Sequence, residues 1–64
     1  MWAEIKRAPN LMIAEMWKDL FDGEGIVGHI LPDPGYEGAG ELRPYRVYVP
    51  REKLHVAQEV LRKI

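Results

Sequence analysis

The sequence predicts an α+β fold in which two helices cover one face of an antiparallel sheet. Three observations predict it. The hydrophobic period alternates between that of strands and that of helices, prolines and glycines separate the periodic segments, and 64 residues leave room for one domain, 1–64. Apolar residues make up 47% and charged residues 30%, which is typical of a globular chain rather than a disordered one.

The first element is a short strand over residues 2–7. Ala3 and Ile5 alternate with polar or aromatic neighbours, and this period of two is typical of a half-buried strand. Pro9 ends it because proline has no N–H to donate to a sheet. The opposite face of the strand would carry Trp2, Glu4 and Lys6.

An amphipathic helix is expected over residues 11–22. Asn10 is a favoured N-cap, and Gly23 or Gly25 provides a stop after the last apolar residue. Charged residues occupy the face opposite the apolar stripe, so the helix should pack on one side only. The stripe consists of Ala14, Trp17, Leu20 and Phe21.

Two more strands and a second helix complete the chain. The apolar run 26–31 and the alternating run 43–49 are expected as strands, separated by a proline- and glycine-rich loop at 32–42. Pro50 suits the first turn of a helix, and residues 51–64 have helical periodicity.

The order strand–helix–strand–strand–helix predicts a ferredoxin-like sandwich that lacks the last strand, a βαββα arrangement. The third strand would lie between the other two, and the first strand would be an open edge. The residues expected to be buried are Ile5, Ala14, Trp17, Leu20, Phe21, Val47, Val49, Leu54, Ala57 and Leu61.

The sheet face without helices is the candidate interface or ligand face. Trp2, Arg46 and Tyr48 should lie on it, and His29 is a further candidate, although the period leaves open whether His29 or its neighbours point that way. Aromatic side chains exposed on a flat face indicate a binding surface. A domain this small gains stability by association, so we expect a homo-oligomer, most simply a dimer.

The residue types exclude several chemistries. The chain has no Cys, Ser or Thr, which excludes disulfides, thiolate metal sites and the usual acyl-transfer nucleophiles. His55 and Glu59 lie one helical turn apart, but a third metal ligand is missing nearby. The glycines from Gly35 to Gly40 lack the lysine of a phosphate loop. We therefore expect no catalytic, cofactor or metal site, and no enzyme activity.

Charge and hydropathy bear on the partners. Nine Lys and Arg oppose ten Asp and Glu, so the net charge of −1 makes nucleic acid an unfavoured partner. Residues 43–51 do interleave basic and aromatic side chains, which keeps a single-stranded RNA-binding module on the open sheet face as the alternative. No apolar run approaches a membrane span or a signal peptide, so a cytoplasmic protein without membrane contact is expected.

The run 7–30 combines a strand end, an asparagine-capped helix with the pair Ala14-Glu15, and the helix-ending pair Gly25-Ile26. These features resemble the opening of the DUF2007 family. Members of this family are small bacterial proteins described as prokaryotic signal-transducing proteins.

The run 45–61 resembles the closing pattern of the same family, with the strand end Val47-Tyr48-Val49-Pro50 followed by a helix. The family is similar in fold to the nitrogen-regulatory PII proteins, so the resemblance implies a ferredoxin-like fold and a tendency to oligomerise. The nucleotide-binding loop of PII proteins has no counterpart here, so nucleotide sensing is not implied. The expected function is a small non-catalytic regulatory or signalling module that self-associates and binds a partner or small ligand.

Overall fold

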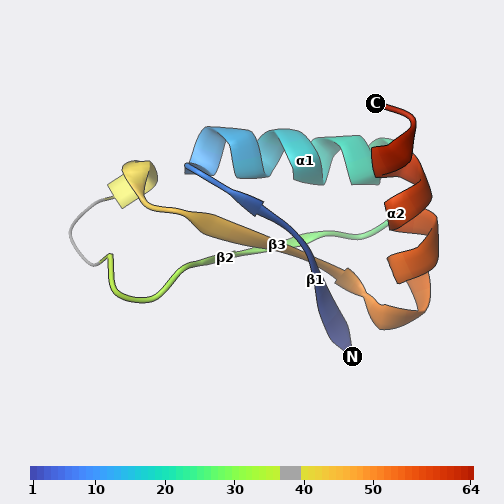
Figure 1. The fold of residues 1–64 in the computed structure, drawn as a ribbon, viewed down its shortest axis with the longest axis horizontal. Helices are drawn as coiled ribbons and strands as arrows, with labels where there is room; N and C mark the ends of the chain where they lie inside the picture. The colour runs from blue at the N-terminus through green and yellow to red at the C-terminus, as the bar shows by residue number, and fades with distance from the viewer. Residues whose placement is uncertain (37–39) are drawn as a thin grey trace.

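A three-stranded antiparallel sheet with two α-helices forms the protein in the computed structural model, which describes residues 1–36 and 40–64 (Figure 1). This confirms the α+β class and the βαββα order. The elements are β1 (Trp2–Ala8), α1 (Leu11–Gly23), β2 (His29–Pro32), η1 (Gly40–Leu42), β3 (Tyr45–Pro50), η2 (Arg51–Lys53) and α2 (Leu54–Arg62).

The sheet has the expected order β1-β3-β2, with both outer strands antiparallel to β3. In Figure 1, α1 runs along the sheet and α2 stands across one end of it. Phe21 of α1, Ala57 of α2, and Val47 and Val49 of β3 are all fully buried in one cluster. Both helices therefore cover the same face of the sheet.

The core agrees with the prediction in its centre and differs at its margins. The expected residues that are fully buried are Ala14, Phe21, Val47, Val49 and Ala57. The expected residues that are half-buried and pack against this centre are Ile5, Trp17, Leu20, Leu54 and Leu61. The buried hydrophobic residues that were not among those expected are Ala8, Ile26 and Val60.

A β-bulge in β1 corrects the predicted faces of this strand. The register runs from Glu4 opposite Tyr48 to Lys6 opposite Val47, so β1 contains one extra residue between these two pairs. Beyond the bulge the alternation is reversed. The Lys6 ammonium lies 5.0 Å from the ring centroid of Trp17 on α1, and not on the open face as predicted. Arg7 takes the open-face position instead.

The end of α1 explains why β2 begins later than predicted. Gly25 has a φ of +79°, its N–H donates to the Asp22 carbonyl at 3.0 Å, and the N–H of Ile26 donates to the Phe21 carbonyl at 2.9 Å. This is a Schellman motif, in which the residue after the glycine packs back on the helix. Ile26 is buried for this reason, so the run 26–31 contributes its first residues to the helix end and only its later residues to the sheet.

Gly25→Ala should destabilise the protein by about 1–2 kcal/mol, because an L side chain disfavours the left-handed backbone. Open space surrounds the position, so the effect comes from the backbone alone. Gly23→Ala is the matched control: Gly23 is the last residue of α1, has no positive φ and has equally open surroundings, so alanine there should stabilise the protein by up to about 1 kcal/mol. Urea unfolding followed by circular dichroism measures both, and equal effects at the two glycines would contradict the motif.

Candidate functional site

The sheet face opposite the helices is called the open face below. The register settles the position of His29, because it pairs with Tyr48, which on its other side pairs with Glu4. Directly opposed residues share a face, so the three strands place these side chains in one row. The open-face side chains are Trp2, Glu4 and Arg7 of β1, His29 and Leu31 of β2, and Arg46 and Tyr48 of β3, so all four candidate residues lie on it.

One half of the open face is aromatic. The rings of Trp2 and His29 lie 4.1 Å apart between centroids with an interplanar angle of 55°, so they bridge the two outer strands. Trp2 nevertheless keeps 44% of its surface exposed. Tyr48 is half-buried on the central strand beside His29. The face therefore presents a packed aromatic group with a large ring still exposed to solvent.

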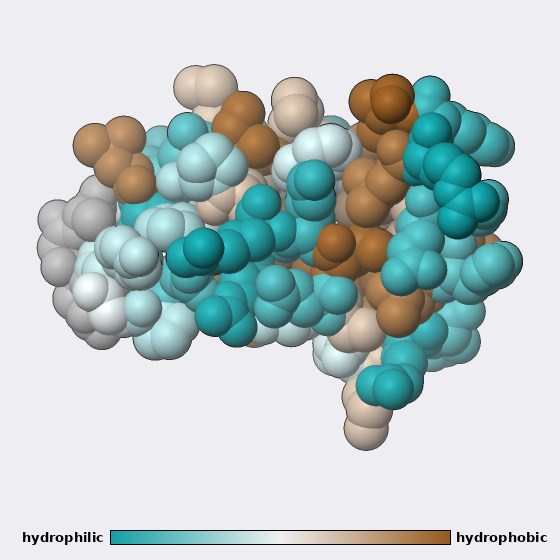
Figure 2. Space-filling view, viewed as in Figure 1, coloured by the Kyte–Doolittle hydropathy of each residue, from teal (hydrophilic) through white to brown (hydrophobic). Residues whose placement is uncertain are grey.

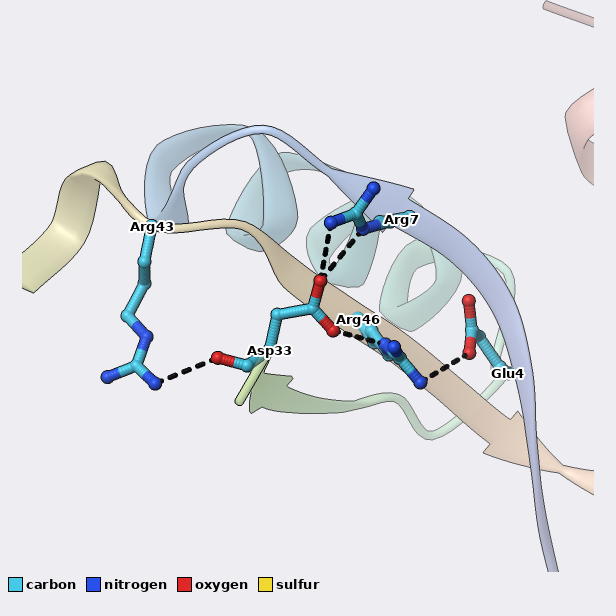
Figure 3. Close-up of polar contacts among 5 residues, drawn as sticks. All are labelled: Glu4, Arg7, Asp33, Arg43 and Arg46. Atoms are coloured by element: carbon cyan, nitrogen blue, oxygen red, sulfur yellow. Dashed lines mark hydrogen bonds and ion pairs between the residues drawn. The ribbon is translucent and has the colours of Figure 1, made fainter. Parts of the chain in front are cut away.

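The other half of the open face is an ion-pair network centred on Asp33, which follows β2 directly (Figure 3). The Nε and Nη2 atoms of Arg7 donate to one carboxylate oxygen of Asp33 at 2.9 and 2.6 Å. The Nε atom of Arg46 donates to the other oxygen. The Asp33 N–H donates to the Pro44 carbonyl at 2.9 Å, which fixes the backbone, and the carboxylate side chain is only 5% exposed.

Two further contacts extend this network. The Nη2 atom of Arg43 donates to the backbone carbonyl of Asp33 at 2.8 Å, and Arg46 also lies 3.5 Å from the carboxylate of Glu4. Three arginines thus converge on one aspartate, and Figure 3 shows its carboxylate between the side chains of Arg7 and Arg46. The network links β1 and β3 to the residue that follows β2.

The network keeps its charges. The hydrogen bonds from Arg7 do most to lower the pKa of Asp33 below its ordinary value, burial opposes them, and Arg46 adds a further lowering. The hydrogen bonds to Asp33 in turn raise the pKa values of Arg7 and Arg46. All three groups are therefore charged at neutral pH, and the Asp33 carboxylate attracts both arginines.

Sequence reasoning identified one member of this network and missed its centre. Arg46 was predicted on the open face, but its charge is engaged by Asp33 and Glu4 rather than free for a ligand. Asp33 falls within the loop predicted at 32–42, although its position between Pro32 and Pro34 at a strand end was a signal for a fixed backbone. Arg7 was missed because the alternation set by Ala3 and Ile5 was extended through the bulge, although the two consecutive charged residues Lys6 and Arg7 interrupt it.

Apolar surface also lies outside the open face. Figure 2 shows hydrophobic side chains along α1 and beside α2. Met12 and Met16 of α1 are 75% and 52% exposed, and Ile64 after α2 is 72% exposed. These exposed apolar side chains are a competing candidate for a contact surface, so variants on α1 serve as controls for variants on the open face.

The described parts of the chain add little else of chemical use. Within 1–36 and 40–64, no three His, Cys, Asp or Glu side chains come together in a way that could hold a metal ion. None of the helices described is long and apolar enough to cross a membrane. The glycine-rich run from Gly35 to Gly40 lies in the loop predicted at 32–42, and its residues 37–39 lie outside the described residues.

No family model, no curated protein and no solved structure matches the chain. The resemblance to the DUF2007 family therefore rests on the residues quoted for it. A proposal about function therefore has to be argued from the geometry of the open face.

Proposed function

We propose that the protein is a small non-catalytic regulatory module that forms a dimer through the aromatic half of its open face and binds a partner protein or small ligand. One observation supports this most directly: Trp2 packs on His29 on the face without helices while remaining 44% exposed. Exposed aromatic rings of this kind are the usual anchors of interfaces. The resemblance to the DUF2007 family, whose members are described as signal-transducing, favours a regulatory role.

The network around Asp33 supports the same proposal, because it makes the face rigid. Arg7 and Arg46 tie the two neighbouring strands to the residue after β2. A face that is already ordered loses little conformational entropy when a partner covers it, which favours binding. Methionine side chains such as Met12 and Met16 are flexible and lose more.

Pairing through the edge of β1 is the competing geometry, and the structure of this strand opposes it. Its extra residue lies between Glu4 and Lys6, and bulges and charged side chains protect sheet edges against pairing. Face-to-face contact of two open faces avoids the bulge. Such an interface should bury more than about 1,000 Å² in total.

Single-stranded RNA is the weaker alternative. Arg43 and Arg46 provide part of the basic character of residues 43–51, and both donate to Asp33. Tyr45 pairs across the sheet with Ala8, which is buried under the helices, so Tyr45 lies on the helix side of the sheet. Its hydroxyl donates to the Gly40 carbonyl at 3.2 Å. Tyr48 is thus the single tyrosine of β3 on the open face. Binding of an oligonucleotide with affinity that falls steeply with salt would favour RNA instead.

The proposal predicts that Trp2→Ala combined with Tyr48→Ala converts the dimer to a monomer. Aromatic anchors at the centre of an interface contribute about 2 kcal/mol each, so the dissociation constant should rise several hundredfold or more. Sedimentation equilibrium at micromolar concentration measures the mass. Met12→Ala with Met16→Ala is the control, because it removes exposed apolar surface from α1 and should leave the dimer intact.

Two results would contradict the proposal. If the wild-type protein is monomeric at these concentrations, the proposed dimer does not form. A Trp2→Ala, Tyr48→Ala variant that stays dimeric would move the contact away from the open face, and loss of the dimer in the control would assign it to α1.

A further inference from the structure

Another candidate surface lies at the outer edge of β2, on the opposite side of the sheet from β1. β2 is the last strand of the sheet on this side, so its outer backbone groups face no strand of the described chain. The Asp33 N–H donates inward to Pro44 on the β3 side. Because the direction alternates along an antiparallel strand, the N–H and C=O of Ile30 point outward. The edge therefore offers both a donor and an acceptor to an incoming chain.

A groove runs along this edge, between β2 and α1, with a volume of about 740 Å³. Its apolar part is formed by Leu11, Ile30 and Tyr45, each half-buried. Glu15 and Asp19 of α1 also line it, and both are exposed. An edge strand beside a helix, with an apolar floor between them, is the geometry that accepts an extended peptide as an added strand.

The charge of the groove indicates which peptide. Lys18 also lines it, but its ammonium is paired with Asp22 at 3.1 Å. Within the described ranges no ion pair reaches Glu15 or Asp19. These two carboxylates lie one helical turn apart, where like charges repel. A cation seated beside them would relieve that repulsion.

We propose that the edge of β2 binds an extended segment of another protein as a fourth strand of the sheet. One side chain of the segment is apolar and covers Ile30 and Tyr45. A lysine or arginine two positions away lies beside Glu15 and Asp19, because alternate residues of a strand share a face. His29 also lines the groove, but Trp2 and Tyr48, the residues that the dimer test replaces, do not, so the proposal does not depend on the dimer.

The test uses a capped nonapeptide with threonine at the odd positions and with valine and lysine in turn at the even positions, so that it contains two lysines. The peptide is titrated into the isotopically labelled protein. The amide resonance of Ile30 should shift downfield and its hydrogen exchange should slow, as expected for a newly bonded N–H. Replacing both lysines by glutamate should abolish binding. If the amide resonance of Ile30 does not change at peptide concentrations up to about 1 mM, the proposal is wrong. A dissociation constant of that size corresponds to a binding free energy of only about 4 kcal/mol.

Two sets of variants separate strand addition from simple charge attraction. N-methylation of one alternate set of peptide amides should abolish binding while methylation of the other set preserves it; equal effects of the two sets would contradict strand addition. Glu15→Gln with Asp19→Asn should weaken binding roughly two- to thirtyfold, as expected for two exposed ion pairs. Glu52→Gln, exposed on η2 away from the groove, is the matched control and should bind normally.

Failure of this proposal is distinguishable from failure of the dimer. The variant Trp2→Ala, Tyr48→Ala should bind the peptide unchanged, and Glu15→Gln with Asp19→Asn should leave the measured mass unchanged. Peptide-induced shifts that map to Trp2 and Tyr48 instead of Ile30 would overturn the edge site.

Discussion

Phe21→Ala should remove about 3–5 kcal/mol of the free energy of unfolding, the usual loss for a large aromatic side chain in a core. Phe21 is fully buried, and its carbonyl accepts the N–H of Ile26 at the end of α1. A protein of 64 residues has a total stability of about 3–10 kcal/mol, at roughly 0.05–0.15 kcal/mol per residue. The substitution should therefore leave a large fraction of the chain unfolded, as measured by urea unfolding followed by circular dichroism.

Met12→Ala is the matched control for this prediction, because Met12 lies on the same helix and is 75% exposed. Its effect should stay within about 0.5 kcal/mol. Phe21→Leu keeps part of the apolar side chain and gives a measurable transition if Phe21→Ala does not fold. If Phe21→Ala were no more destabilising than Met12→Ala, the position of α1 on the sheet would be wrong.

The elements that local sequence determines were predictable. Asn10 caps α1 with its side-chain oxygen, which accepts the N–H of Ile13 at 2.9 Å, as its position before an amphipathic run indicated. The strand order followed from the order of elements and the short connections. Helix caps and periods depend on residues close in sequence, and the sequence is informative about them.

Features that depend on distant partners were not predictable in the same way. The bulge in β1 exists only relative to Val47, which lies opposite Lys6, and it decides that Lys6 turns to α1 while Arg7 turns to the open face. The alternation of Ala3 and Ile5 was extended to Lys6, although Lys6 and Arg7 are two charged residues in a row, and it therefore predicted the wrong face beyond this point. Trp2 was placed on the correct face because it lies before the bulge, whereas the position of His29 was left open until the register with Tyr48 was known.

The same bulge explains why the charged half was missed. Arg7 and Arg46 are direct partners across β1 and β3, a like-charge pair that would destabilise the sheet by itself. Asp33 lies between the two guanidinium groups and compensates for both. Three segments far apart in sequence must fold before this compensation exists, so no local pattern predicts it.

Asp33→Asn should therefore destabilise the protein more than any other single carboxylate-to-amide change, because it keeps the size of the side chain but leaves Arg7 and Arg46 to repel each other. Thermal unfolding at neutral pH measures the loss. Asp22→Asn, at an exposed pair with Lys18, is the control and should change the melting temperature little. Adding Arg7→Gln to Asp33→Asn should restore part of the lost stability, since it removes one of the two repelling charges.

The pH dependence gives an independent check of the same network. The pKa of Asp33 is lowered in the folded state, chiefly by Arg7, so its contribution to stability is present above the ordinary aspartate pKa of about 4 and is lost as the pH falls below that value. Wild type should lose more stability than Asp33→Asn between about pH 7 and about pH 3, because the variant has no carboxylate to protonate at this position. Parallel stability curves for the two proteins would show that the arginines do not hold Asp33 ionised, and failure of Arg7→Gln to rescue would show that their repulsion is not what Asp33 compensates.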